Sequence, residues 1–163
     1  KDNPKLNCRL KNMEKFSPKR IILDNKLRTN TNSYLFKTAN KDNTIIFYNE
    51  ADKSKILEFK KRKIEIIKSK IDTKKRFDLK LVLTRLYKLG CRNILVEGGN
   101  ELTKHFLNKK IFNLFYLFKS PRKLSKLTEF KEFNGFNILK QNYKNKLIIN
   151  SNLRNDTITL YKK

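Results

Sequence analysis

Short apolar runs recur along the chain and predict its strands. Five of them are dense in β-branched and aromatic residues, at 20–23, 44–48, 64–67, 93–97 and 112–118. Their apolar residues are continuous rather than alternating, which is typical of strands covered on both faces of a sheet. The pattern therefore predicts a buried sheet rather than a half-exposed one.

Helical periodicity fills the intervals between these runs. The clearest helix begins after Asp78, a good N-cap residue, and ends at Gly90, the expected residue past a helix end. Two shorter helices are predicted at about 52–61 and 100–108. From residue 136 onward the pattern predicts strands only, at 136–140, 147–150 and 157–161.

The alternation of strand and helix is typical of an α/β protein with a mixed, mainly parallel sheet flanked by helices. The C-terminal strands are expected to form an antiparallel set. No linker is long enough to divide the chain, so residues 1–163 are expected to form a single domain.

Charge is the most unusual feature of the composition. The 163 residues carry a net charge of +25, and clustered Lys and Arg are typical of proteins that bind nucleic acid. However, the chain has 31 Lys, 20 Asn and 15 Ile against 2 Ala, which is the composition that A/T-rich codons produce. The lysines are also spread from Lys1 to Lys163 rather than gathered in one segment. We attribute most of the charge to codon bias and expect no specific nucleic-acid partner.

Other classes of protein are disfavoured by what the chain contains. Cys8 and Cys91 are too few and too far apart for a zinc site, and reduced thiols in a cytoplasmic protein are the simpler expectation. No apolar run approaches the roughly 20 residues of a membrane span, so no membrane partner is expected. The one histidine, His105, lies inside a predicted helix without an obvious Ser or Cys partner, which disfavours a hydrolase triad.

Three segments carry candidate chemistry. In the first, Glu97 ends an apolar run, Gly98 and Gly99 permit close backbone approach, and a helix starts at Asn100. Ligands gather at the carboxyl ends of strands, and helix N-termini bind phosphates. A tight turn with a solvated Glu97 explains the same pattern equally well.

The second and third segments are 2–10 and 18–28. Arg9 is one of only nine arginines, and its forked guanidinium matches phosphate better than lysine does. Asp24 and Asn25 follow a predicted strand, where they could bond a ligand or make a local turn.

Taken in order, the segments DNPKLNCRL, PKRIILDNKLR and DLKLVLTRLYKLGCRNILVEGGNELTKHFL, followed by a strand and SPRKL, suggest a family. The chain resembles the C-terminal reductase domain of the bacterial riboflavin-biosynthesis deaminase/reductase, which has a dihydrofolate-reductase-like fold. The resemblance covers residues 1 to about 125. It implies that a further strand, and then a deaminase domain, lie upstream of residue 1, and it leaves a homodimer open.

The resemblance also implies a reaction and a set of site residues. NADPH would give a hydride to the ribosyl C1′ of a phosphorylated pyrimidine, 5-amino-6-(5-phosphoribosylamino)uracil. Substrate would be bound by Leu6, Arg9 and Glu97, and the cofactor by Asp2, Asn25, Gly98, Gly99 and Asn100. Asp2 and Glu97 would assist catalysis.

Some positions depart from the family pattern. Asn25 stands where Ser or Arg is commoner, Phe112-Asn113-Leu114 replaces an acidic pair, and Ser125 replaces a glycine. Two alternatives therefore stay open: a related reductase with another pyrimidine or pteridine substrate, and a basic nucleic-acid-binding module.

Overall fold

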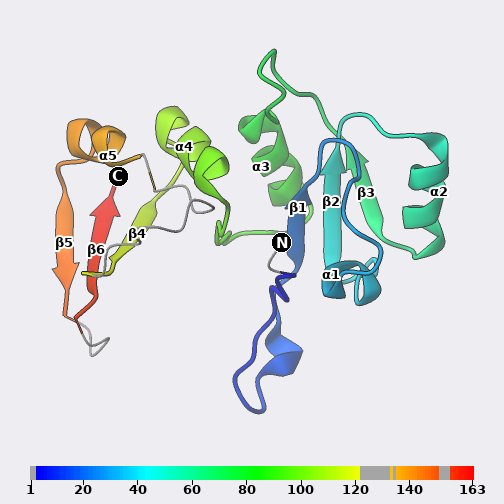
Figure 1. Ribbon diagram of the computed structural model, residues 1–163, viewed down its shortest axis with the longest axis horizontal. Helices are drawn as coiled ribbons and strands as arrows, with labels where there is room; N and C mark the ends of the chain where they lie inside the picture. Colours follow the sequence, from blue (N-terminus) through cyan, green and yellow to red (C-terminus); the bar gives the residue numbers. More distant parts are fainter. Residues whose placement is uncertain (1–2, 122–132, 134, 151–154) are drawn as a thin grey trace. The chain divides into compact units, whose positions relative to one another are not determined.

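The computed structural model describes residues 3–121, 133, 135–150 and 155–163. The chain divides into two compact units, Lys1–Arg92 and Asn93–Lys163 (Figure 1). Each unit has its own sheet and its own apolar core, so each is described by itself.

The first unit is built on a parallel sheet of three strands. These are β1 (Arg20–Leu23), β2 (Thr44–Tyr48) and β3 (Glu65–Lys68), with β2 in the centre. In the register, Ile22 lies opposite Ile46, and Ile46 opposite Ile66. The three predicted strands in this region are confirmed, the third displaced by one residue.

Helices cover both faces of this sheet. On one face, α1 (Tyr34–Lys37) and α2 (Lys53–Lys61) bury Phe36 and Phe59 against Ile46. On the other face, α3 (Leu79–Lys88) buries Val82 and Leu86. A short 3-10 helix, η1 (Glu14–Phe16), precedes β1. Burial on both faces accounts for the continuous apolar runs of the strands.

The ends of α3 follow from single residues. The Asp78 carboxylate accepts hydrogen bonds from the backbone N–H groups of Lys80 at 3.0 Å and Leu81 at 3.2 Å, as an N-cap should. Gly90 has a φ of +87°, which stops the helix at low cost because glycine has no Cβ. Both predicted ends are confirmed.

The second unit is an antiparallel sheet with two helices. Its strands are β4 (Leu114–Lys119), β5 (Lys146–Ile149) and β6 (Thr157–Lys162), in the order β4-β6-β5. The helices are α4 (Asn100–Lys109) and α5 (Phe136–Asn142). Parallel strands with helices followed by antiparallel strands give the predicted mixed α/β class.

The prediction of a strand at 136–140 is wrong, because these residues open α5. Leu139 and Tyr143 are four residues apart and bury their side chains with Leu107 of α4 and Tyr161 of β6 in one core. A short apolar run is compatible with a helix or a strand. Here the helix is favoured, because it places residues four apart on the same face, where both are buried.

The prediction of a strand at 93–97 is also wrong. These residues adopt no regular structure, and Leu95 is 81% exposed. A strand needs a neighbouring backbone to pair with, and none of the described strands pairs with this segment. The apolar run is therefore present without the partner that would bury it.

Candidate functional site

The carboxyl ends of β1, β2 and β3 lie at one edge of the sheet in the first unit. We call the residues that directly follow these strands, 24–29, 49–52 and 69, the rim. The Asn25 carbonyl accepts hydrogen bonds from the backbone N–H groups of Asn49 at 3.0 Å and Glu50 at 3.1 Å. The Asn49 side chain donates to the Ser69 carbonyl at 2.9 Å. These bonds join the loops after all three strands, at the edge where ligands gather in parallel sheets.

Asp24 and Asn25, the two polar residues that end β1, have different roles. One oxygen of the Asp24 carboxylate accepts from the Thr29 N–H at 2.6 Å and from the Thr29 hydroxyl at 2.7 Å. The side-chain oxygen of Asn25 is buried without a hydrogen-bond partner. Asp24 therefore closes its own loop, whereas Asn25 keeps an acceptor that a bound group can use.

The N-terminal segment also belongs to the first unit. Asp2 lies outside the described residues. Leu6 is half-buried with a left-handed φ of 50°, and Arg9 is exposed. Asn3 ties the segment to α1, because its side-chain oxygen accepts from the Tyr34 N–H at 2.8 Å.

The N-terminal segment also contains a buried polar atom that the sequence did not predict. The Asn7 side-chain oxygen is buried without a partner, like that of Asn25. Asn7 lies between Leu6 and Arg9, the two residues expected to bind substrate. Only its position within the motif could have suggested it from sequence.

Glu97, Gly98, Gly99 and Asn100 lie in the second unit, at the start of α4. Gly99 is the N-cap residue, with a φ of −67° and a ψ of 178°, and Glu97 is exposed. No side chain caps this helix, so its first N–H groups keep their capacity to bind an anion.

The two glycines differ in their surroundings. A Cβ added at Gly98 would lie 2.6 Å from the Leu102 Cδ2 atom, so packing against α4 favours glycine there. A Cβ added at Gly99 would meet nothing within 4 Å, and its φ is accessible to any residue. Packing thus gives no reason for glycine at 99; glycine is a favourable N-cap residue, and the open space leaves room for a ligand to approach the backbone.

The predicted site residues thus fall into two groups. Leu6, Arg9 and Asn25 belong to the first unit, and residues 97–100 belong to the second. Within the first unit, the orphaned oxygen of Asn25 is an acceptor suited to a polar edge of a bound cofactor. Within the second unit, the open space at Gly99 and the first N–H groups of α4 suit a phosphate.

Arg20 begins β1, at the opposite end of the strand from the rim. Its guanidinium donates to the Thr44 and Thr38 hydroxyls at 3.1 and 2.8 Å, and to the Thr38 carbonyl and the Asn43 side-chain oxygen, both at 3.0 Å. Burial lowers the pKa of Arg20 from its ordinary value. Arg20 therefore joins the start of β1 to the start of β2 and to the residues that precede it.

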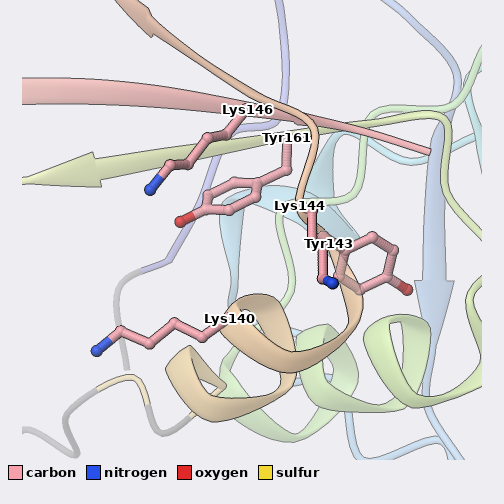
Figure 2. A pocket seen from close by; sticks show the side chains of 5 residues that line it. All are labelled: Lys140, Tyr143, Lys144, Lys146 and Tyr161. Atoms are coloured by element: carbon pink, nitrogen blue, oxygen red, sulfur yellow. The ribbon is translucent and has the colours of Figure 1, made fainter.

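A small pocket of about 250 Å³ lies in the second unit, lined by Lys140, Tyr143, Lys144, Lys146 and Tyr161 (Figure 2). The Tyr143 hydroxyl donates to the Leu107 carbonyl at 3.1 Å, and burial raises the pKa of Tyr143. The pocket contains none of the expected site residues. The candidate residues lie elsewhere, at the rim in the first unit and at the start of α4 in the second.

The described part of the chain has no group of three or more His, Cys, Asp or Glu side chains arranged to hold a metal ion. None of the helices has the length and apolar character needed to cross a membrane.

Comparison with known proteins gives one consistent result. The sequence pattern of a protein family described as the RibD C-terminal domain matches residues 1–144. The riboflavin biosynthesis protein RibD of Actinobacillus pleuropneumoniae is 32% identical over 121 residues, which are 74% of this chain and 31% of that protein. RibD of Aquifex aeolicus is 30% identical over 122 residues, 75% of this chain and 32% of that protein.

Solved structures share the fold. Acinetobacter baumannii RibD aligns with a TM-score of 0.67 and 17% identity, over 99% of this chain and 43% of that one. A pyrimidine reductase-like protein of Corynebacterium diphtheriae aligns with a TM-score of 0.64 and 17% identity, over 90% of this chain and 61% of that one. The chain spans about a third of the length of the curated relatives.

Proposed function

Because the chain belongs to the RibD C-terminal domain family, we propose that it is the reductase domain of a riboflavin-biosynthesis enzyme. Both units together would form this domain. The observation that carries the proposal is the continuous match over residues 1–144, which includes both groups of expected site residues.

We propose NADPH as the cofactor, which supplies a hydride when bound. The substrate is 5-amino-6-(5-phosphoribosylamino)uracil, whose ribosyl C1′ is reduced to give the ribitylamino product. Hydride transfer needs little acid–base chemistry from the protein, which mainly orients the two reactants.

Different residues of the chain would bind the substrate, bind the cofactor and transfer the proton. The Arg9 guanidinium holds the substrate phosphate through two parallel hydrogen bonds, and Leu6 packs beside it. Gly98, Gly99 and the first N–H groups of α4 receive the cofactor phosphates, while Asn25 accepts a hydrogen bond from the cofactor. Glu97, with Asp2, moves the proton that opens the ribose ring.

The test is NADPH oxidation by the natural full-length chain, followed by absorbance. We expect oxidation with the deaminated pyrimidine phosphate and none with dihydrofolate, which tests the alternative of a related reductase. A folded chain that leaves NADPH unchanged with the pyrimidine would refute the proposal.

The role of Arg9 is tested in the same assay. Arg9→Ala removes the phosphate contact, so the KM for the pyrimidine should rise at least about tenfold, the loss of one charge-assisted pair, with little change in the KM for NADPH. Arg85→Ala is the matched control, because Arg85 is exposed on α3 and has no proposed role. An unchanged pyrimidine KM in Arg9→Ala would remove the phosphate role.

A further inference from the structure

The pocket of about 250 Å³ in the second unit is lined by basic and aromatic side chains (Figure 2). We call it the lysine pocket, and its lining residues are Lys140, Tyr143, Lys144, Lys146 and Tyr161. Lys140 lies in the last turn of α5, Lys144 in the connection that follows, and Lys146 opens β5. A short connection between a helix and a strand therefore brings three ammonium groups to one pocket.

Two tyrosine rings give the lysine pocket a fixed apolar wall. Tyr143 is 5% exposed and Tyr161 is 8% exposed, and both belong to the core cluster that contains Leu107 and Leu139. The Tyr143 hydroxyl is engaged within this core, because it donates to the Leu107 carbonyl. A charge held against such a wall is screened less than a charge surrounded by water.

The Tyr161 hydroxyl is available to a bound group. It makes no hydrogen bond with any residue that the structure describes. Tyr161 lies directly opposite Lys146 in the antiparallel register of β5 and β6, so both side chains extend from the same face of the sheet. The Lys146 ammonium and the Tyr161 hydroxyl also point in the same direction (Figure 2). One bound oxygen atom is therefore placed to accept hydrogen bonds from both.

Among the described residues, no carboxylate lines the lysine pocket. The lining holds three Lys and no Asp or Glu, and residues 133–150 include no acidic residue. The ion pairs of the described residues, Arg76 with Asp72 and Lys104 with Glu101, involve none of these lysines. Three like charges around one pocket repel each other, and a cleft lined by one sign of charge with an apolar wall concentrates ions of the opposite sign.

The C-terminal end of α5 opposes an anion, because a helix carries a partial negative charge there, of about half an elementary charge. Two of its last carbonyls are engaged within the chain. The Leu139 carbonyl accepts from the Tyr143 N–H at 2.9 Å. The Ile138 carbonyl accepts from the Asn142 side chain at 3.1 Å. Three full positive charges outweigh the partial charge that remains.

We propose that the lysine pocket binds a phosphate dianion, either free or as the end group of a small ester. The ammonium groups of Lys140 and Lys146 and the Tyr161 hydroxyl donate to its oxygens, and Lys144 adds a third positive charge. A phosphate suits three cations better than a carboxylate, because it carries about twice the charge and has three strong acceptor oxygens. The pocket contains none of the residues proposed to bind substrate or cofactor, so the proposal goes beyond the proposed function and does not rest on it.

The experiment measures the rate at which each lysine is acylated by an N-hydroxysuccinimide ester, followed by peptide mass spectrometry. The natural full-length chain is treated at constant ionic strength, with chloride replaced by inorganic phosphate in one series and by glycerol 3-phosphate in another. Acylation of Lys140 and Lys146 should slow at least about threefold at saturation, because a bound dianion keeps an ammonium protonated. The series that protects at the lower concentration identifies the free or the esterified ligand.

Lys162 is the internal control for this measurement. It is exposed in β6, next to Tyr161, and its side chain extends from the opposite face of the sheet. Its acylation rate should not change with phosphate. Equal slowing at Lys162 and at the pocket lysines would mean that phosphate acts through the net charge of the chain.

Tyr161→Phe tests the geometry of the lysine pocket rather than its charge. It removes the hydroxyl and keeps the ring in the core. The phosphate concentration that gives half protection should therefore rise about threefold to tenfold, which corresponds to the loss of one hydrogen bond. Tyr116→Phe is the matched control, because Tyr116 is exposed in β4 of the same sheet and does not line the pocket.

Three results would overturn the proposal. The first is the absence of protection at Lys140 and Lys146 in both series. The second is equal slowing at Lys162. The third is a half-protection concentration that is the same in Tyr161→Phe, Tyr116→Phe and the parent chain.

Discussion

Replacing Gly98 and Gly99 by alanine, one at a time, distinguishes a glycine needed for packing from a glycine needed for ligand binding. The two residues are adjacent in the sequence, both precede α4, and the substitution is identical. In Gly98→Ala the new Cβ would lie 2.6 Å from the Leu102 Cδ2 atom and 2.9 Å from its Cβ and Cγ atoms. Rotation of the Leu102 side chain relieves only the contacts with Cγ and Cδ2, because its Cβ is fixed to the helix backbone.

The expected loss of stability follows from this overlap. Forcing one extra carbon into a filled space costs about 1–3 kcal/mol. For a chain of this length, that corresponds to a fall in Tm of roughly 2–12 °C. Gly98→Ala should therefore be measurably less stable in urea or thermal unfolding followed by circular dichroism.

Gly99→Ala should behave in the opposite way. Its Cβ meets nothing within 4 Å. The reduced freedom of the unfolded chain stabilises by about 0.4–1 kcal/mol, and the weaker N-cap preference of alanine offsets it. Stability should stay within about 0.5 kcal/mol of the parent, while NADPH affinity falls at least about tenfold because the methyl group occupies the space of the phosphates.

The expectations for the two variants can be refuted separately. If Gly99→Ala binds NADPH with the parent dissociation constant in calorimetry, the cofactor phosphates do not approach residue 99. If Gly98→Ala unfolds at the parent Tm, contact with Leu102 is not the reason for glycine at 98.

Three further predictions concern stability. Tyr143→Phe removes the buried hydrogen bond to the Leu107 carbonyl and should cost about 1 kcal/mol in urea unfolding. The pKa of Tyr143 is raised in the folded state, so the parent should lose stability as pH rises from the unfolded pKa of about 10 through the folded value. If the free energy of unfolding of Tyr143→Phe had the same dependence on pH, Tyr143 would not be the cause. Arg20→Met removes four hydrogen bonds from β1 to Thr38, Asn43 and Thr44, so it should cost roughly 2–3 kcal/mol, and a Tm equal to that of the parent would show that Arg20 is dispensable. Asp78→Ala should cost about 1 kcal/mol by uncapping α3, whereas Asp78→Asn should keep most of the stability in the same unfolding assay.

The sequence predicts the first unit well because its signals are local. Asp78 and Gly90 mark the ends of α3 by their own backbone chemistry, and the apolar runs of β1 and β2 coincide with the strands residue for residue. The run at 93–97 fails because a strand also depends on its neighbours. An apolar segment indicates that burial would be favourable, but it does not supply the second strand.

The sequence names candidate site residues, but it does not show which contacts each of them makes. Asp24 and Asn25 look interchangeable as polar residues after a strand, and only the position of Thr29 shows that Asp24 is engaged inside its loop. In the same way, Gly98 and Gly99 differ only in their distance from Leu102, four residues further on. These distinctions depend on where side chains meet, which the spacing of motifs does not contain.

For binding a small anion, the surroundings of a basic side chain matter more than the number of basic residues in the chain. Among the described residues only two ion pairs form, Arg76 with Asp72 and Lys104 with Glu101, so most cations remain solvated. A solvated lysine on a mobile stem binds a phosphate weakly, because it loses side-chain freedom and water on binding. Arg20 differs from these solvated cations because it is buried, but its guanidinium donates four hydrogen bonds to neutral groups of the chain. The number of basic residues therefore does not by itself indicate a site that recognises a small anion.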